Sequence, residues 1–143
     1  MRLNYLFKYP FFVFAIILLC TEIAKATDVY LGEEWGYEIH GKTLYVLGGD
    51  IYNNSSYRSG SLQVQYWALP RKFDGKSQKG YKMGTYNVRR PIDGGQALLN
   101  VSGRVRYYRP ASGRWWVSII LCEWNGSRWV ARSWLTYGSR KRF

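Results

Sequence analysis

The chain has 143 residues, with 21 Lys and Arg against nine Asp and Glu, and carries a formal net charge of +12 at neutral pH. This cationic excess predicts a surface that attracts polyanions, although it says nothing about the fold. One His and two Cys leave little material for nucleophilic catalysis or metal binding. The sequence contains no zinc-ligand spacing, phosphate-binding glycine loop or dinucleotide fingerprint, so we expect no cofactor and no metal.

The first 26 residues have the plan of a secretory signal peptide. Arg2 and Lys8 precede an uninterrupted apolar run at residues 11–19, and the small residues Ala24 and Ala26 follow it. The run is shorter than the roughly 20 residues that span a bilayer, and no later segment is long or apolar enough to replace it. We therefore expect cleavage after Ala26 and a secreted or periplasmic mature protein without a transmembrane segment.

Two other fates of the leader stay open. Lipid attachment at Cys20 would anchor the chain, although Leu19 stands where a lipoprotein signal needs a small residue. An uncleaved leader would anchor the chain as well.

A mature chain that begins at Thr27 keeps 18 cationic and eight carboxylate side chains, a formal charge of +10, because the leader holds three of the cations and one carboxylate. The charge is uneven, since residues 27–50 hold five carboxylates and one cation, whereas residues 51–143 hold three carboxylates and 17 cations. Cys122 is then the only cysteine and cannot form an internal disulfide. We expect it to be a small strand residue, with an intermolecular bridge as the alternative.

Residues 27–137 alternate between runs rich in Tyr, Trp, Val, Ile and Leu and turn clusters of Gly, Asn, Ser and Pro, without a sustained helical repeat. Such short period-two runs are typical of strands. We expect strands at 43–53 with a break at Gly48-Gly49, at 61–69, at 81–88, at 97–108 with an interruption around Gly103, at 114–123 and at 127–137, after a first strand with Tyr37 and Ile39. About seven strands predict an all-β antiparallel sandwich over residues 27–137, with residues 138–143 as a basic C-terminal tail.

The last hairpin turns at Asn125-Gly126, which allows two registers. A two-residue turn pairs Trp124 with Ser127, whereas a three-residue loop with a left-handed Gly126 pairs Glu123 with Ser127. We prefer the three-residue loop because it gathers an apolar set on the inner face, as a sandwich interior requires. Its outer face then shows Trp116 beside Trp134, Ser118 beside Arg132, Ile120 beside Val130, and Cys122 beside Arg128.

Three segments carry a family resemblance: Asn-Asn-Ser-Ser-Tyr-Arg-Ser-Gly-Ser-Leu-Gln-Val-Gln-Tyr-Trp-Ala-Leu at 53–69, Gly-Tyr-Lys-Met-Gly at 80–84, and Gly-Arg-Trp-Trp-Val-Ser-Ile-Ile-Leu at 113–121 with the hairpin after it. The chain resembles bacterial exported immunoglobulin-like β-sandwich domains over about residues 50–137. The resemblance implies an immunoglobulin-like fold and an exported location. It transfers no catalytic residue, because such domains mostly lack an assigned activity.

Catalytic arrangements are few. His40 lies far in sequence from Cys122, and in the preferred register Cys122 neighbours Arg128, so a Cys-His pair is not expected. The carboxylates that could serve glycoside hydrolysis, Glu38, Asp50, Asp74, Asp93 and Glu123, mostly occupy predicted turns or strand ends, and the acidic cluster Asp28, Glu33, Glu34 and Glu38 lacks the spacing of a calcium loop. We expect a non-enzymatic domain.

The remaining signal is a basic and aromatic surface. Alternation along the predicted strands places six residues on one outward face, which we predict to be the binding site: Arg104, Arg106, Arg128, Arg132, Trp116 and Trp134. Guanidinium groups bind phosphate or carboxylate, and exposed aromatic rings stack on sugars or bases. The expected partner is anionic: a polysaccharide, lipopolysaccharide, nucleic acid or acidic protein. A structural subunit that docks through a sheet edge is the alternative, and a small secreted hydrolase is a third.

Overall fold

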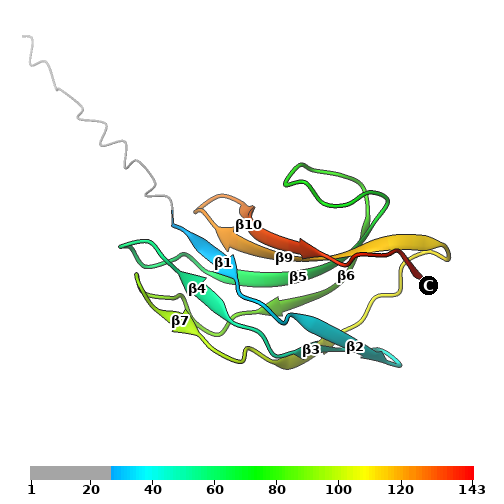
Figure 1. Cartoon of the computed structure of the whole chain (residues 1–143), viewed down its shortest axis with the longest axis horizontal. Coiled ribbons are helices and arrows are strands. Elements are labelled where there is room, and N and C mark those ends of the chain that lie inside the picture. The colour runs from blue at the N-terminus through cyan, green and yellow to red at the C-terminus, as the bar shows by residue number, and fades with distance from the viewer. Residues whose placement is uncertain (1–26) are drawn as a thin grey trace, which may run out of the picture.

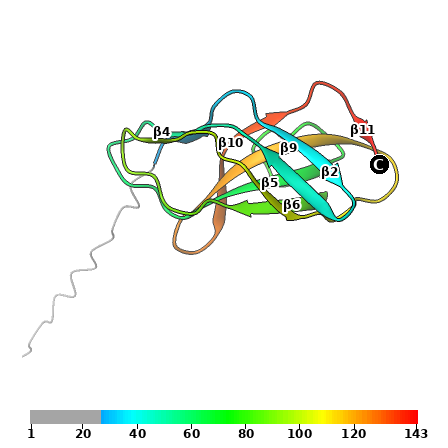
Figure 2. The same cartoon turned by 90° about the horizontal axis from the view of Figure 1, so that it is seen from below.

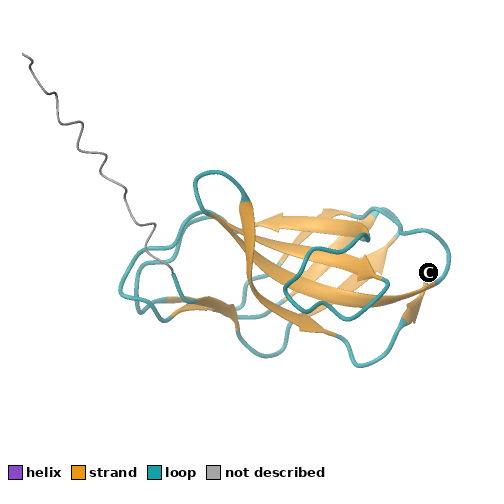
Figure 3. Ribbon diagram, turned by 90° about the horizontal axis from the view of Figure 1, so that it is seen from above, coloured by secondary structure: helices purple, strands orange, loops and turns teal. Residues whose placement is uncertain are grey.

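The computed structural model of the chain describes residues 27–143, and the predicted leader at residues 1–26 lies outside the described residues. Strands joined by loops make up the described part, which contains no helix and hence none that could cross a bilayer (Figure 3). The strands are β1 (Val29–Leu31), β2 (Gly36–His40), β3 (Thr43–Leu47), β4 (Ile51–Asn53), β5 (Leu62–Leu69), β6 (Tyr81–Asn87), β7 (Ala97–Leu98), β8 (Gly103–Arg106), β9 (Arg114–Trp124), β10 (Trp129–Thr136) and β11 (Lys141–Arg142). The predicted all-β class is confirmed.

The larger sheet has the antiparallel order β10-β9-β5-β6, with β11 added to the start of β9. The two central strands explain the apolar runs of the sequence. In β5, alternate residues point to the core and are almost fully buried: Leu62, Val64, Tyr66 and Ala68. They lie opposite Glu123, Leu121, Ile119 and Val117 of β9. The period-two pattern thus gives the sheet an apolar inner face that ends at the buried carboxylate of Glu123.

The second layer is an antiparallel ribbon of three long strands, each of which is interrupted and so divided into two labelled strands: β1 and β2, β3 and β4, and β7 and β8. On one side of the interruption the order is β1-β4-β7, and on the other side it is β2-β3-β8. The Trp35 ring fills the break, because a Cβ added at Gly49 would lie 2.5 Å from it. Trp35 Nε1 also donates to Asp50 O over 3.0 Å. The predicted break at Gly48-Gly49 is confirmed, and the indole occupies the space beside Gly49.

The two layers face each other across the apolar core (Figure 1). Hydrogen bonds join them along both sides: Leu31 N donates to Ser133 Oγ over 3.1 Å, and Tyr108 N donates to Met83 O over 2.8 Å. In the view from below, β2 and β11 lie toward one end of the domain and β4 toward the other (Figure 2).

The structure corrects both predicted registers of the last hairpin. Trp124 pairs with Trp129, so residues 125–128 form the turn, and Asn125 Oδ1 accepts hydrogen bonds from the backbone N–H groups of Ser127 and Arg128. A bulge between Ala131 and Ser133 then shifts the register once more. The asparagine side chain stabilises a longer turn than the Asn-Gly pair alone predicts. As a result Trp134 lies opposite Ile120 rather than Trp116, and Cys122 lies opposite Ala131 rather than Arg128.

The predicted C-terminal tail is part of the sheet rather than an appendage. Lys141 pairs with Trp115 and Arg142 pairs with Arg114, which makes β11 an added strand beside β9. Phe143 N donates to Gly113 O over 3.0 Å and extends this pairing. Two consecutive cations are therefore held at a fixed place on the domain.

Candidate functional site

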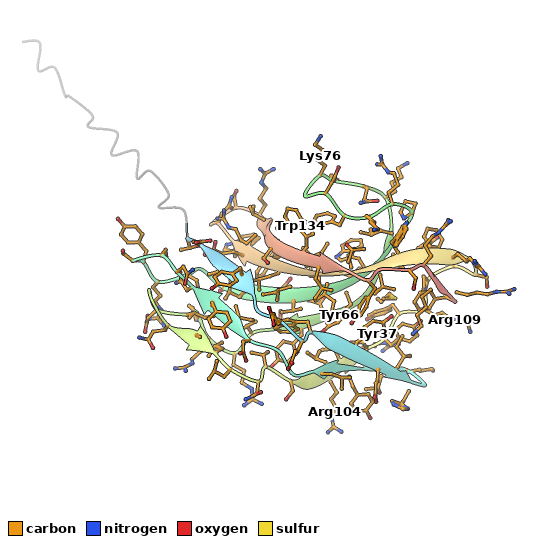
Figure 4. The ribbon with its side chains drawn as sticks, viewed as in Figure 1. Tyr37, Tyr66, Lys76, Arg104, Arg109 and Trp134 are labelled. Carbon is orange, nitrogen blue, oxygen red and sulfur yellow. The ribbon has the colours of Figure 1, made fainter. Side chains whose placement is uncertain are left out.

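An open cleft of about 680 Å³ lies where β8 and its following segment approach β11 and the β2–β3 turn. We call it the basic cleft and define it by its lining residues: Ile39, Gly41, Lys42, Arg106, Tyr107, Tyr108, Arg109, Lys141, Arg142 and Phe143. Figure 4 shows Arg109 at the same end of the domain as β11. The cleft thus combines three segments that are distant in sequence.

Backbone pairing fixes the segments that carry these side chains. Thr43 pairs with Arg106 in the ribbon, and Tyr107 N donates to Lys42 O over 2.9 Å. Because β8 pairs with β3 and β11 pairs with β9, Arg106, Lys141 and Arg142 are displayed from paired backbone, while Lys42 and Arg109 lie in the segments next to these strands. A site on paired strands loses less conformational entropy on binding than a mobile tail.

The charged side chains that line the basic cleft have one sign. Five of them are cationic, Lys42, Arg106, Arg109, Lys141 and Arg142, and no lining side chain is a carboxylate. Among the described residues, none of these five makes an ion pair with Asp or Glu. Arg104 lines a smaller adjoining hollow together with Lys42 and Arg106. Uncompensated like charges around a concave surface focus a positive potential into it.

Aromatic rings hold two of the cations in place. Arg106 Cζ lies 5.5 Å from the centre of the Tyr108 ring, which is 58% exposed. Lys141 Nζ lies 5.0 Å from the centre of the Tyr37 ring and 5.5 Å from that of Phe143. A cation over an aromatic face is attracted by the ring quadrupole, so these contacts orient the charges without neutralising them.

A tyrosine cluster lies behind Lys141 and links the two layers. The Tyr37 ring packs against Tyr66 and Tyr137 with centroid distances of 5.9 and 5.7 Å (Figure 4). Burial raises the pKa of Tyr37 and Tyr66 far above the ordinary value, and it raises that of Tyr137 as well. Burial also raises the pKa of Tyr107, whereas the charge of Arg109 acts to lower it. Tyrosines are neutral at physiological pH even at their ordinary pKa, so these phenols add no negative charge to the cleft.

The structure does not bring the six predicted site residues together on one face. Arg104 and Arg106 belong to β8 in the ribbon, while Trp116, Arg128, Arg132 and Trp134 belong to β9, β10 and the turn between them in the larger sheet. Figure 4 shows Arg104 and Trp134 on opposite sides of the domain. The prediction of a single face is wrong because alternation fixes which residues of one strand share a side, not which sheet the strand joins.

Two of the predicted site arginines differ sharply in their surroundings. Arg132 occupies the bulge of β10, where its Nε donates to Glu123 Oε2 over 2.8 Å. Arg128 lies exposed in the turn. Arg132 therefore has a structural partner, and only Arg128 of this pair presents a free-standing charge.

The two predicted tryptophans pack against the loop between β5 and β6, residues 70–80. Lys72 Nζ lies 4.8 Å from the centre of the Trp116 ring, and the Phe73 ring meets Trp134 edge to face with a centroid distance of 5.1 Å. Their rings support this loop.

The sequence predicted Arg106 of the basic cleft and Arg104 of the adjoining hollow as site residues. It did not predict Lys42, Arg109, Lys141 and Arg142 as site residues. The available signal was the density of cations at 104–109 and 140–142. Their meeting with the turn that carries Lys42 depends on the pairing of β8 with β3 and of β11 with β9, which no local pattern encodes.

The carboxylates weighed for catalysis are engaged in local structure. Glu38 contacts His40 over 3.1 Å, Asp50 accepts from Tyr52 Oη and Asn100 N, and Asp93 lies near Arg58. Cys122 is buried in β9, and burial raises its pKa to about 11. Within residues 27–143, no group of His, Cys, Asp and Glu is arranged to hold a metal ion.

No family model matches the chain, and no curated protein matches it. Among solved structures, β-glucosidase 3B from Thermotoga neapolitana in complex with glucose is similar at 17% identity and a TM-score of 0.43, covering 82% of this chain and 17% of that one. A β-glucosidase from Kluyveromyces marxianus in complex with glucose has 12% identity and a TM-score of 0.38, covering 82% of this chain and 14% of that one. The chain thus spans under a fifth of these enzymes, and likenesses this loose carry no argument about its family or activity.

Proposed function

We propose that this protein is a non-enzymatic exported binding module that holds an extended polyanion in the basic cleft. The observation that carries the proposal is the set of five cationic side chains around an open cleft whose lining contains no Asp or Glu side chain. Guanidinium groups bind phosphate, sulfate and carboxylate through charge-assisted hydrogen bonds. The adjoining Arg104 extends the positive surface beyond the cleft, which suits a polymer better than a small anion.

The exported location is part of the same proposal. It rests on the leader sequence, with cleavage after Ala26 and a mature chain that starts at Thr27. The intact mass of the exported product checks it directly, and a full-length chain recovered from the membrane fraction would contradict it.

The finer fold assignment is also a proposal: the two facing layers form an immunoglobulin-like β-sandwich. Support comes from the all-antiparallel pairing and from a core built by alternate residues of both layers. An experimental structure with these strand pairings, compared with immunoglobulin-like domains, tests it.

The experiment for the basic cleft measures binding of the mature protein to a sulfated polysaccharide, a polyuronate, lipopolysaccharide, duplex DNA and an acidic peptide over a range of salt concentrations. At least one should bind with an affinity that falls steeply as salt rises. The triple variant Arg106→Ala, Arg109→Ala and Lys141→Ala should weaken binding and flatten the salt dependence, by about one unit of log–log slope for each lost contact.

A matched control removes the same charge elsewhere. Arg71, Arg89 and Arg90 are exposed and do not line the basic cleft, so their triple alanine variant should keep most of the affinity. Equal losses in the two triple variants would show that net charge, not the cleft, drives association. Binding that ignores salt would favour the alternative of docking through a sheet edge.

A further inference from the structure

A second hollow, of about 450 Å³, lies on the outer face of the larger sheet beneath residues 70–80. We call it the loop groove, and its lining residues are Gln65, Trp67, Leu69, Phe73, Gly75, Ser77, Gln78, Ile120, Cys122, Arg128, Trp129, Val130 and Ala131. None of them lines the basic cleft. Figures 1 and 3 show the loop standing over this face of the sheet. The volume falls in the range of roughly 300 to 1,000 Å³ that is usual for small-molecule sites.

The floor of the loop groove is ordered by a chain of side-chain hydrogen bonds along β5. Trp67 Nε1 donates to Gln65 Oε1 over 2.9 Å, and Gln65 Nε2 donates to Gln63 Oε1 over 3.1 Å. Gln63 Nε2 in turn donates to Asn87 Oδ1 over 2.8 Å. Gln65 is only 7% exposed, yet each end of its amide has made one bond and can make another. The floor therefore offers an oriented donor and acceptor.

The loop supplies a second amide. Gln78 Oε1 is buried and accepts no hydrogen bond from the described residues. A buried oxygen without a donor costs free energy, so a turn of the Gln78 side chain that brings this oxygen to a donating ligand group in the groove would be favoured.

The walls of the loop groove are aromatic. Phe73 lines it from the loop, and Trp129, which is 36% exposed, lines it from β10. The Trp129 ring meets Trp124 edge to face with a centroid distance of 5.5 Å, which fixes its orientation. Arg128 is the single charged residue of the lining. The site therefore suits a ligand that is mainly uncharged.

The loop is held over the groove by Trp134. Its ring contacts Phe73, and a Cβ added at Gly75 would lie 2.7 Å from it. Gly75 has a φ of +84°, and Lys76 N donates to Asp74 Oδ1 over 3.0 Å, so the loop tip is a defined turn. A groove with preset walls loses little entropy on binding.

From these features we infer that the loop groove binds one sugar ring of a neutral saccharide. A pyranose has an apolar C–H face that packs on an indole and hydroxyl groups that both donate and accept. Trp129 would supply the stacking surface, and the amides of Gln65 and Gln78 would bond the hydroxyls. One lining cation is too few for a nucleic acid, and the amide floor disfavours a purely apolar ligand. This inference does not rest on the basic cleft.

The test titrates the mature domain with short neutral oligosaccharides of glucose, galactose, mannose and N-acetylglucosamine at low and high salt, following binding by calorimetry and by two-dimensional NMR. At least one sugar should bind with little salt dependence and shift the indole N–H signals of Trp67 and Trp129. Trp129→Ala should weaken binding about tenfold or more and Gln78→Leu about threefold to tenfold. Tyr108→Ala, which removes an aromatic of the basic cleft, should leave the affinity unchanged.

The signal shifts of the unaltered protein keep the test decisive even where a variant fails to fold, and Trp129→Phe offers a milder substitution. Absence of binding across the panel, or sugar-induced shifts confined to the basic cleft, would overturn the inference. Failure of the polyanion experiment leaves this result untouched, because the two sites share no lining residue.

Discussion

Arg132 and Glu123 form an ion pair in which Arg132 Nε donates to Glu123 Oε2 over 2.8 Å, with the Glu123 side chain only 4% exposed. The same carboxylate accepts from Gly60 N over 2.7 Å and from Thr27 Oγ1. The buried charge is thus fully partnered, and it connects the end of β9 to β10, to the segment before β5 and to the start of the described chain. Its partners make Glu123 a structural residue.

Removal of Arg132 should leave that carboxylate without its counter-charge. We expect Arg132→Ala to lower the free energy of unfolding by about 3 kcal/mol. This value is at the lower end of the range for breaking a buried ion pair, because Arg132 is partly exposed. Urea denaturation measures it. Arg128→Ala, an exposed turn position on the same hairpin, is the control and should change stability by less than about 0.5 kcal/mol. Equal losses of unfolding free energy in the two variants would show that the ion pair does not stabilise the fold.

Gly49→Ala should strain the break in the ribbon. The new Cβ would overlap the Trp35 ring, whose Nε1 is bonded to Asp50 O, so neither group can move away freely. We expect a loss of about 1 to 3 kcal/mol by thermal or urea unfolding. Gly138→Ala is the matched control, since an added Cβ there meets nothing within 4 Å. A neutral Gly49→Ala would mean that Trp35 does not set the position of the break.

The thiol of Cys122 should react slowly in the folded protein. Burial raises its pKa from 9.0 to about 11, with Lys82 opposing the shift, so little thiolate exists at pH 8. Since the folded-state pKa is the higher one, this group's contribution to stability is complete below pH 9 and declines between pH 9 and about 11. Iodoacetamide labelling at pH 8 with and without urea measures the difference. Labelling at equal rates in both conditions would contradict the burial.

Trp134→Ala should loosen the loop over the groove rather than affect polyanion binding. The ring supports Phe73 and Gly75, whereas the second tryptophan beside the loop, Trp116, contacts the Lys72 ammonium group. Amide hydrogen exchange in residues 71–79 should accelerate, while the salt-dependent affinity for polyanions stays unchanged. Trp124→Ala, at another exposed indole, serves as control for the exchange measurement. A loss of polyanion binding in Trp134→Ala would instead indicate that Trp134 belongs to the polyanion-binding site.

The sequence by itself determined the all-β class, most strand positions and the break at Gly48-Gly49, because these follow from side-chain alternation and turn residues over a few positions. It also marked Arg104 and Arg106 as outward-facing. Two short strands escaped it: β1 and β11 are too brief for a periodic signal.

Only the tertiary structure decided where the cations meet. Lys42, Arg109 and Lys141 come together because β8 joins β3 while β11 joins β9, and the order of strands in a sheet is set by the packing of the whole chain. The bulge at Arg132 likewise brings its guanidinium group to the carboxylate of Glu123, nine positions earlier and across the hairpin. Long-range pairing of this kind leaves no local pattern in the sequence. As a result, the residues of the predicted face lie in three places: Arg132 in an ion pair, Trp116 and Trp134 beside the loop at residues 70–80, and Arg106 in the basic cleft.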